Sequence, residues 1–420
     1  IKSVCKHPLP VFGQREMNAR PLIIRFFSAT KLYWGLIVLF VIGVVISPES
    51  FKGSNIFLSQ ENLSNVLRQV SNNGILAVGM TLVILTAGID LSVGTMMAMG
   101  STLAAMLLTL HGWSSASYAC VPAMGIASFL VLHSAFSSFF PSDRDGFRPA
   151  AFFFSLLVAA GVSLWGISQV ASGFTVVGVL VAVPLFTFLL GGVTGAVIAR
   201  GRLQPFIVTL AMMIAVLGGA RLIAGEGHSV YPIYYGENAP EAFSILGEML
   251  FGVVPVPGIF FLASVAVFWI VLNLTRFGRY VYAIGGNEDA SLLSGIGVDR
   301  IKIIVYALSG LMAGLTGVLF AAQFQQGKPD AGTGNELDAI AAVVIGGTSL
   351  MGGRGSVVGT LVGVLIFGIL SNILVLQEVP SNWQLVFKGG IIVVAVLLQE
   401  GRFQEWFSFL RPGRTAAGAE

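Results

Sequence analysis

The chain has 420 residues, of which 55% are hydrophobic and only 10% are charged, and its formal net charge is +3. Soluble domains carry about 25% charged residues, so this composition excludes a water-soluble protein and indicates that lipid surrounds most of the chain. So small a net charge also argues against nucleic acid as a partner, because polyanions are bound by strongly basic surfaces. We therefore expect an all-α polytopic membrane protein, since helices satisfy their own backbone hydrogen bonds in lipid.

The N-terminal residues precede the first apolar segment. Residues 1–16 show no core-forming pattern, and a natural start could equally lie at Met17. Segment 32–47 follows several basic residues, as the apolar part of a signal peptide does, but residues 47–50 offer no small-x-small cleavage site. We therefore expect 1–31 to be a cytoplasmic segment and 32–47 to be a retained membrane anchor.

Twelve apolar segments approach the length of about 20 residues that a transmembrane helix needs. They lie at 32–47, 74–89, 91–110, 118–140, 150–170, 174–199, 206–224, 258–274, 303–322, 337–350, 357–376 and 385–399. Several are short, so we expect about 10–12 transmembrane helices, some of them broken. Segments 74–89 and 337–350 could be re-entrant instead of crossing, because polar or glycine-rich stretches end them.

The positions of Lys and Arg predict the orientation of these segments. If all twelve cross and the N-terminus is cytoplasmic, all but five of the 23 Lys and Arg fall on the cytoplasmic side. The exceptions, placed on the outer side, are Lys52, Arg68, Arg221, Lys328 and Lys388. This is the bias of the positive-inside rule, so both termini are predicted to be cytoplasmic, with a membrane domain at 32–399 and a cytoplasmic tail at 400–420. The loop 225–257 is then an extracytoplasmic cap, ordered or partly helical.

Two polar or glycine-rich stretches interrupt the apolar pattern. Residues 86–95 (TAGIDLSVGT) place Asp90 and several hydroxyl groups within an apolar run, and residues 346–355 (GGTSLMGGRG) interrupt another. Paired interruptions indicate the pathway or the moving elements of a transporter. Asp90 either caps a helix by accepting from the amide of Ser92 or Val93, or has a gating or structural role in the pathway, and the sequence leaves both open.

Other glycines predict close helix packing. The chain contains 52 glycines, and the pairs Gly191/Gly195 and Gly310/Gly314 have the small-xxx-small spacing. Lipid gives helices no hydrophobic reason to associate, so close backbone approach has to supply the packing.

Two acidic residues, Glu336 and Asp338, stand at the start of segment 337–350. The positive end of the helix dipole favours acids in the first turn of a helix. We interpret them as such first-turn acids, with a proton-coupling role as the alternative.

The sequence lacks the residue patterns of an enzyme or a metal site. No GxxxxGK[ST] motif is present, so this chain cannot bind and hydrolyse a nucleotide by the P-loop route. The cysteines Cys5 and Cys120 and the four histidines show no metal-ligand spacing, and there is no HExxH motif or Ser-His-Asp set. We therefore expect no catalytic residues and no metal, and active transport would need an ion gradient or another polypeptide.

The large inner loop at 275–302 is expected to contact a partner. Its second half predicts a short amphipathic helix, capped by Asn287, with acids in its first turn and an end at Gly295. The apolar face of this helix consists of Leu292, Leu293 and Ile296. Such a helix suits docking into a groove on a soluble partner, and the alternative is a helix that lies on lipid headgroups.

Three blocks of the sequence resemble a known family. They are TLVILTAGIDLSVGT at 81–95, the 275–302 loop, and ELDAIAAVVIGGTSLMGGRGSVVG at 336–359. Over roughly 56–110 and 175–399 the chain is similar to the permease subunits of bacterial ATP-binding-cassette (ABC) sugar importers of the ribose and xylose type. The resemblance implies a multi-pass protein of the bacterial inner membrane, which works as a homodimer with two cytoplasmic ATPase subunits and a periplasmic sugar-binding protein. ATP would be used by the partner subunits, and this chain would bind no cofactor.

The resemblance also implies roles for individual residues. The short ATPase-contacting helix of the family maps onto Asn287, Glu288, Asp289, Ala290, Leu292, Leu293 and Gly295. Asp289 stands where alanine is commoner. Candidate residues of the substrate pathway are Asp90, Ser92, Thr95, Asn335 and Thr348.

One departure from the family lies at 112–172. Two apolar segments around a polar turn are present there, and the shorter members of the family lack them. An even number of added crossings preserves the orientation of everything downstream. We therefore expect a peripheral two-helix insertion.

The implied function is translocation of a monosaccharide, a pentose such as ribose or xylose, delivered by the binding protein and driven by the ATPase subunits. One alternative keeps this machinery but carries a branched-chain amino acid or a purine nucleoside. Another alternative is an ion-coupled secondary transporter that works alone. It predicts uptake that collapses with an uncoupler while ATP is held constant.

Overall fold

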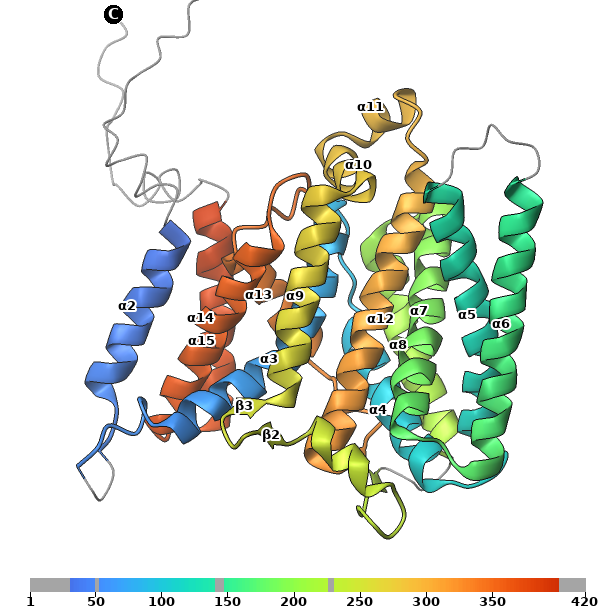
Figure 1. Cartoon of the computed structure of the whole chain (residues 1–420). Helices are drawn as coiled ribbons and strands as arrows, with labels where there is room; N and C mark the ends of the chain where they lie inside the picture. The colour runs from blue at the N-terminus through green and yellow to red at the C-terminus, as the bar shows by residue number, and fades with distance from the viewer. Residues whose placement is uncertain (1–30, 50–52, 140–146, 226–229, 400–420) are drawn as a thin grey trace, which may run out of the picture.

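The structure is a computed structural model that describes residues 31–49, 53–139, 147–225 and 230–399. The described part is a bundle of helices (Figure 1). The helices are α2 (Lys31–Ile46), α3 (Gln60–Leu85), α4 (Val93–Thr109), α5 (Ser115–Phe139), α6 (Phe147–Ser172), α7 (Val176–Gly201), α8 (Pro205–Ala224), α9 (Val256–Leu274), α10 (Arg276–Gly286), α11 (Glu288–Leu293), α12 (Val298–Phe324), α13 (Asn335–Ile345), α14 (Val357–Leu376) and α15 (Ser381–Gln399). Within the described residues, seven helices are long and apolar enough to cross a membrane, so the all-α polytopic fold class is confirmed.

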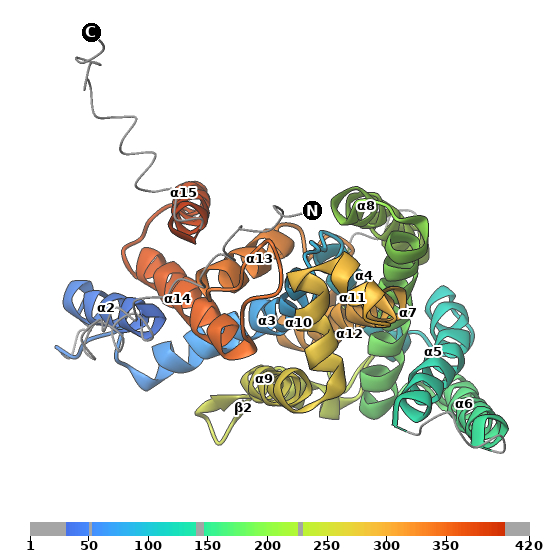
Figure 2. The ribbon, with the colours of Figure 1, turned by 90° about the horizontal axis from the view of Figure 1, so that it is seen from above.

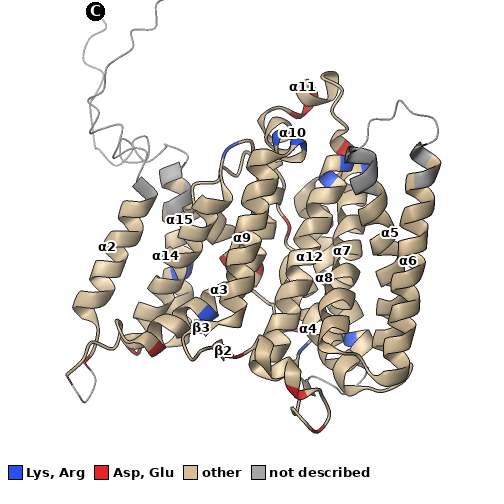
Figure 3. Ribbon diagram, in the orientation of Figure 1, with Lys and Arg blue, Asp and Glu red and all other residues tan. Residues whose placement is uncertain are grey.

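The two ends of the bundle differ in charge. Lys and Arg gather at the end where α7, α10 and α12 meet (Figure 3), with Arg200 and Arg202 at the end of α7 and Arg300 and Lys302 at the start of α12. By the positive-inside rule this end is cytoplasmic. The start of α2 and the end of α15 lie on the same side (Figure 1). The described chain therefore enters and leaves the bundle at its cytoplasmic end.

α12 runs through the centre of the bundle and packs mainly against α7, with further contacts to α3 and α4. Glycines set the closeness of this packing. A Cβ atom on Gly191 would lie 3.0 Å from the carbonyl carbon of Tyr306, and one on Gly310 would meet the carbonyl oxygen of Thr187. The glycines predicted to bring helices together therefore do so at the α7–α12 contact.

Replacing Gly310 with valine is expected to destabilise the protein by at least about 1–3 kcal/mol, the usual cost of overpacking. The new side chain would meet the backbone of α7, which cannot move without shifting the whole helix. Gly218 in α8 gives a matched control, because a Cβ atom there has no heavy atom within 4 Å. The thermal unfolding midpoint in detergent should fall for Gly310→Val and stay near wild type for Gly218→Val. Equal midpoints would contradict the packing role.

α5 and α6 lie at one edge of the bundle (Figure 2). They pack on each other, and α5 also packs on α7. The outer face of α6 exposes the apolar side chains of Phe152, Phe153, Leu157 and Leu164. Such a face suits contact with lipid. These helices form most of segment 112–172, whose origin as an insertion stays a prediction.

An ordered cap covers the outer end of the bundle, opposite α10 and α11. It consists of β1 (Tyr231–Pro232) paired antiparallel with β4 (Gln326–Gly327), β2 (Met249–Leu250) paired antiparallel with β3 (Val254–Pro255), and the 3₁₀ helix η1 (Glu241–Leu246). The Tyr235 hydroxyl donates to the Ala322 carbonyl oxygen at 2.6 Å. Burial, with a smaller effect of Glu248, raises the pKa of Tyr235 to about 12, so this hydroxyl keeps its proton. The cap is thereby attached to the end of α12.

Two helices begin earlier in the chain than the apolar pattern predicts. α3 begins at Gln60 instead of residue 74, and α15 begins at Ser381 instead of residue 385. Arg68 therefore lies within α3 and not in a loop, and Lys388, which the predicted segment 385–399 already contained, lies within α15. The physical reason is that the outer half of α3 carries many polar side chains and is helical nevertheless, because its buried side, with Ser64, Val66 and Val70, packs against protein.

α13 is much shorter than the predicted segment 337–350. It ends at Ile345, and its 11 residues span only about 16 Å. Residues 346–356 are non-helical, with positive φ at Gly347, Gly352 and Gly353. The strand β4 precedes α13 at the capped end of the bundle, and Gly353 follows it beside Leu85, next to α10. The chain therefore passes through the bundle here and is not re-entrant.

Candidate functional site

The starts of α4 and α13 meet inside the bundle. α4 begins after the non-helical residues 86–92, and α13 begins at Asn335. The backbones approach so closely that a Cβ atom on Gly332 would lie 3.0 Å from the Cα atom of Gly94. The Nδ2 atom of Asn335 lies 3.4 Å from the sulfur of Met97 in α4. The starts of the two helices are therefore neighbours, and the first-turn amides of each have no partner within their own helix.

Asp90 is fully buried, and its carboxylate joins the non-helical residues 86–92 to α12. Its Oδ1 accepts from the backbone N–H of Ser92 at 3.0 Å and from the Ser92 hydroxyl at 2.6 Å. Its Oδ2 accepts from the hydroxyl of Ser309 in α12 at 3.1 Å. The amide of Ser92 is one of the two donors that the capping interpretation expects. The bond to Ser309 adds a connection to α12 that no sequence pattern indicates.

Replacing Asp90 with alanine is expected to cost at least about 1–3 kcal/mol of stability, because buried donors on Ser92 and Ser309 lose their acceptor. Asp90→Asn keeps one acceptor oxygen in nearly the same place and should cost less. The thermal unfolding midpoints of the two variants in detergent measure the difference. An alanine variant that unfolds at the same temperature as the asparagine variant would refute this role.

Four of the five predicted pathway residues lie around the starts of α4 and α13. Ser92 and Thr95 stand with Asp90 at the start of α4, where the Thr95 hydroxyl donates to the Ser92 carbonyl oxygen at 2.9 Å. Asn335 joins them from α13. Thr348 lies beyond the other end of α13, beside Gly355, so it is separated from the other four. Contact of these residues with a solute stays a prediction.

The predicted partner-contacting helix is α11. The Oδ1 atom of Asn287 accepts from the backbone N–H of Ala290 at 2.9 Å, which caps the helix, and the predicted end at Gly295 has φ of +81°. Leu292 and Leu293 are 60% and 89% exposed. Ile296, assigned to the same apolar face, packs against the core instead. The helix and its cap are confirmed, and its exposed apolar surface is two leucines.

A groove of about 480 Å³ lies beside α11, between the end of α7 and the starts of α8 and α12. Its charged lining consists of Arg202, Glu288, Asp289, Asp299 and Lys302. The Nζ atom of Lys302 donates to both carboxylate oxygens of Glu288 at 2.7 Å, which joins α11 to α12. An apolar surface with a charged rim is the usual composition of a protein-binding site.

α10, which the sequence reasoning missed, connects α11 to both interrupted stretches. A Cβ atom on Gly285 would meet the carbonyl oxygen of Leu85 at the end of α3. The backbone N–H of Gly353 donates to the same oxygen at 3.0 Å, and the Tyr282 hydroxyl donates to the Gly355 carbonyl at 3.0 Å. A displacement of α10 is therefore transmitted to the end of α3 and to the glycine-rich loop 346–356.

A sequence signal for α10 does exist. Val281 and Ile284 are three residues apart and both are buried, as the apolar face of a helix requires. The signal is weak because the helix has only 11 residues and two of them are a terminal glycine pair.

Comparison with known proteins places this geometry in a family. The family described as branched-chain amino acid transport system / permease component matches residues 62–396. The ribose import permease protein RbsC of Escherichia coli (strain K12) is 39% identical over 367 residues, which cover 86% of this chain and 91% of that protein. RbsC of Bacillus subtilis (strain 168) is 37% identical, with 87% and 91% covered. The xylose transport system permease protein XylH of Haemophilus influenzae (strain ATCC 51907 / DSM 11121 / KW20 / Rd) is 33% identical, with 86% and 94% covered.

Solved structures gave no match. The family match begins within α3 and ends within α15, so it includes both interrupted stretches, α10 and α11. Together with the seven helices that can span a membrane, these likenesses identify a multi-pass protein of the inner membrane. The chain belongs to the family of permease components of branched-chain amino acid transport systems, which makes it a transport subunit.

Proposed function

We propose that this chain is the permease subunit of an ABC importer and that it moves a pentose, such as ribose or xylose, into the cytoplasm. The observation that carries the proposal is the exposed pair Leu292 and Leu293 beside the charged groove at the cytoplasmic end. The chain has no P-loop motif, so transport driven by ATP requires a separate ATPase, and this surface suits such a protein partner. The cargo is supported by relatives named for ribose and xylose.

The proposed partners are two cytoplasmic ATPase subunits, a periplasmic sugar-binding protein and a second copy of this chain. Closure of the ATPase subunits on ATP moves α11. The Glu288–Lys302 ion pair passes the movement to α12, and the contact of Gly285 with Leu85 passes it to α3. The starts of α4 and α13 pack against α3 and α12. The route between the two copies of the chain therefore opens alternately to each side of the membrane.

Reconstitution tests the proposal. Proteoliposomes that contain the chain with its ATPase subunit and binding protein should take up labelled ribose or xylose only when ATP is present, and an uncoupler should have no effect. The chain alone should accumulate no solute. Concentrative uptake by the chain alone, abolished by an uncoupler, would replace the proposal with an ion-coupled secondary transporter.

A branched-chain amino acid is the second candidate cargo, because the description of the matching family names this substrate class. The same proteoliposomes distinguish the two. ATP-dependent uptake of leucine without uptake of ribose or xylose would establish the amino acid and exclude the pentose.

A further inference from the structure

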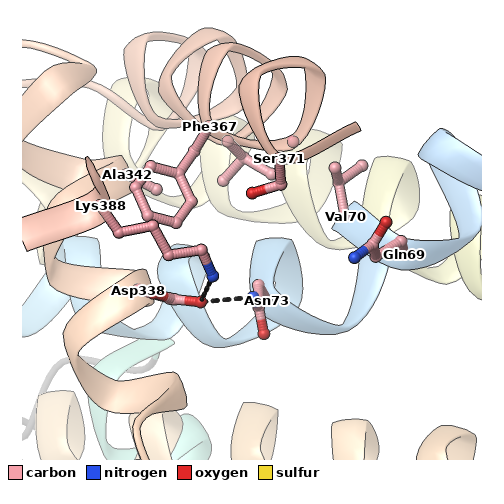
Figure 4. A pocket seen from close by; sticks show the side chains of 10 residues that line it. Gln69, Val70, Asn73, Asp338, Ala342, Phe367, Ser371 and Lys388 are labelled. Carbon is pink, nitrogen blue, oxygen red and sulfur yellow. Dashed lines mark hydrogen bonds and ion pairs between the residues drawn. The ribbon is translucent and has the colours of Figure 1, made fainter. Parts of the chain in front are cut away.

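A polar pocket lies among α3, α13, α14 and α15, of which α14 is long and apolar enough to cross a membrane (Figure 4). Its polar lining consists of Gln69 and Asn73 of α3, Asp338 of α13, Ser371 of α14 and Lys388 of α15. Ionisable groups at membrane depth are costly, and they are retained where they serve the passage of a solute. None of these five residues belongs to the predicted pathway.

An ion pair forms the centre of the pocket. The Nζ atom of Lys388 lies 2.9 Å from Oδ2 of Asp338, and the two side chains are only 22% and 18% exposed. The side-chain amide of Asn73 donates to the same oxygen at 3.4 Å. Lys388 also lies over the ring of Phe367, 5.1 Å from its centroid. Groups from three helices and a ring thereby hold a carboxylate and an ammonium in fixed positions with no net charge.

A stripe of polar side chains along α3 leads from the outer end to this pocket. Asn62, Gln69 and Asn73 share one face of the helix, because they are spaced by seven and four residues. Asn62 and Asn372 exchange hydrogen bonds of 3.1 and 2.8 Å, and Gln69 is exposed. Asn73 lies in the middle of α3. Lipid cannot satisfy exposed amide groups, so the stripe indicates a water-filled approach from outside to half depth.

The groups that line the pocket define the chemistry of a ligand. The carboxylate and the amide oxygens accept hydrogen bonds, the ammonium and amide nitrogens donate them, and the Ser371 hydroxyl does both. Adjacent hydroxyl groups of a neutral polyol can bridge Asp338 and Lys388 without separating them. A zwitterionic amino acid would have to break this ion pair to bind the two charges, and an apolar molecule would leave the polar groups without partners.

The free volume of the pocket in this single chain is about 40 Å³. This volume holds water but not a sugar, since one water needs about 10–15 Å³ measured in this way. A pentose that contacts these groups therefore has to lie mostly outside the pocket, on the side where Gln69 is exposed. Such a partial contact holds a solute weakly, as a transport route requires.

We propose that Asn73, Asp338 and Lys388, with Gln69 at the entrance, form a contact site for the transported solute at half depth, and that this solute is a neutral polyhydroxylated molecule of pentose size. The proposal rests on the proposed function, and it adds the place and the chemistry of the contact.

Substrate protection of a cysteine tests the site. Gln69→Cys is made in a full-length chain that also carries Cys5→Ser and Cys120→Ala, and a charged methanethiosulfonate reagent is applied to membranes that contain the complete complex. D-Ribose or D-xylose, at about four times the concentration that gives half-protection, should slow the modification about fivefold, because only the unoccupied site reacts. Leucine should not slow it. Leu58→Cys, exposed in the outer loop before α3 and absent from the pocket lining, should react at the same rate with and without sugar.

A second substitution, at Asn73 in the Gln69→Cys chain, tests whether the pocket itself binds the sugar. Asn73→Leu should raise the sugar concentration that gives half-protection at least about fivefold, because one hydrogen-bonding group is lost. Its thermal unfolding midpoint should stay near wild type. Asn273→Leu, the same change at an exposed residue near the end of α9, should leave half-protection unchanged.

The outcomes separate this site from the proposed function. If the complex transports ribose but no sugar protects Gln69→Cys, the site is refuted and the function stands. If leucine protects and sugars do not, the chemistry assigned to the pocket is wrong. If the complex transports no pentose at all, the proposed function fails.

Discussion

Replacing Gly285 with alanine is expected to reduce ATP-driven uptake at least about tenfold, which corresponds to about 1.4 kcal/mol of lost coupling. The added Cβ atom would meet the carbonyl oxygen of Leu85 and the backbone nitrogen of Gly353. Neither atom belongs to a flexible side chain, so α10 has to separate from the end of α3. α11 lies outside this contact and its exposed leucines are unchanged, so the ATPase subunits should still bind. The measurement is uptake and ATP hydrolysis by the same reconstituted complex.

Gly286→Ala is the matched control for this prediction. Gly286 is the next residue in the same helix, and a Cβ atom there has no heavy atom within 4 Å. This variant should retain uptake near the wild-type rate. If the two alanine variants transport equally well, the contact between α10 and α3 does not carry the coupling.

Removing one partner of the Asp338–Lys388 ion pair is expected to destabilise the protein by about 3–5 kcal/mol, because it leaves an uncompensated charge in a mostly buried place. Lys388→Met leaves Asp338 with only the long hydrogen bond from Asn73 among its described partners. The double variant Asp338→Asn with Lys388→Met removes both charges and should be more stable than Lys388→Met alone. Thermal unfolding of the wild type, Lys388→Met, Asp338→Asn and the double variant in detergent gives the coupling free energy.

An exposed ion pair in the same chain controls for the charge itself. Lys328 and Asp330 lie 3.4 Å apart, with side chains 40% and 48% exposed. Surface pairs contribute about 0–1 kcal/mol, so Lys328→Met should shift the unfolding midpoint little. A Lys388→Met variant that is no less stable than Lys328→Met would show that water reaches and screens the pair in the pocket.

Apolar pattern alone located most of the membrane helices and failed where a helix is polar on one side. It placed α14 at 357–376, where the structure has it, because nearly all of this helix is apolar. It missed the outer half of α3, because a hydropathy argument assumes that lipid surrounds a helix. One side of this half packs against protein and the other is polar. The residues before 74 that the apolar pattern leaves out therefore include the polar stripe of Asn62, Gln69 and Asn73.

The candidate site was predictable in part, for reasons that differ between its residues. The cap of α11 is local, because the Asn287 side chain bonds only three residues ahead, and local patterns are readable in a sequence. The partner of Asp90 on α12 is 219 residues away, and the bond from Asn73 to Asp338 spans 265 residues. Such pairings depend on how helices pack, and no spacing rule within one segment predicts them.

α12 begins beside α11 and ends under the outer cap, where the Ala322 carbonyl oxygen accepts the hydrogen bond of the Tyr235 hydroxyl. Its 27 residues make one continuous rod of about 40 Å. A rod that is attached at both ends makes events on the two faces of the membrane energetically interdependent. In the proposed complex, any free energy that nucleotide binding inside contributes to receptor docking outside is matched by an equal effect of docking on nucleotide affinity.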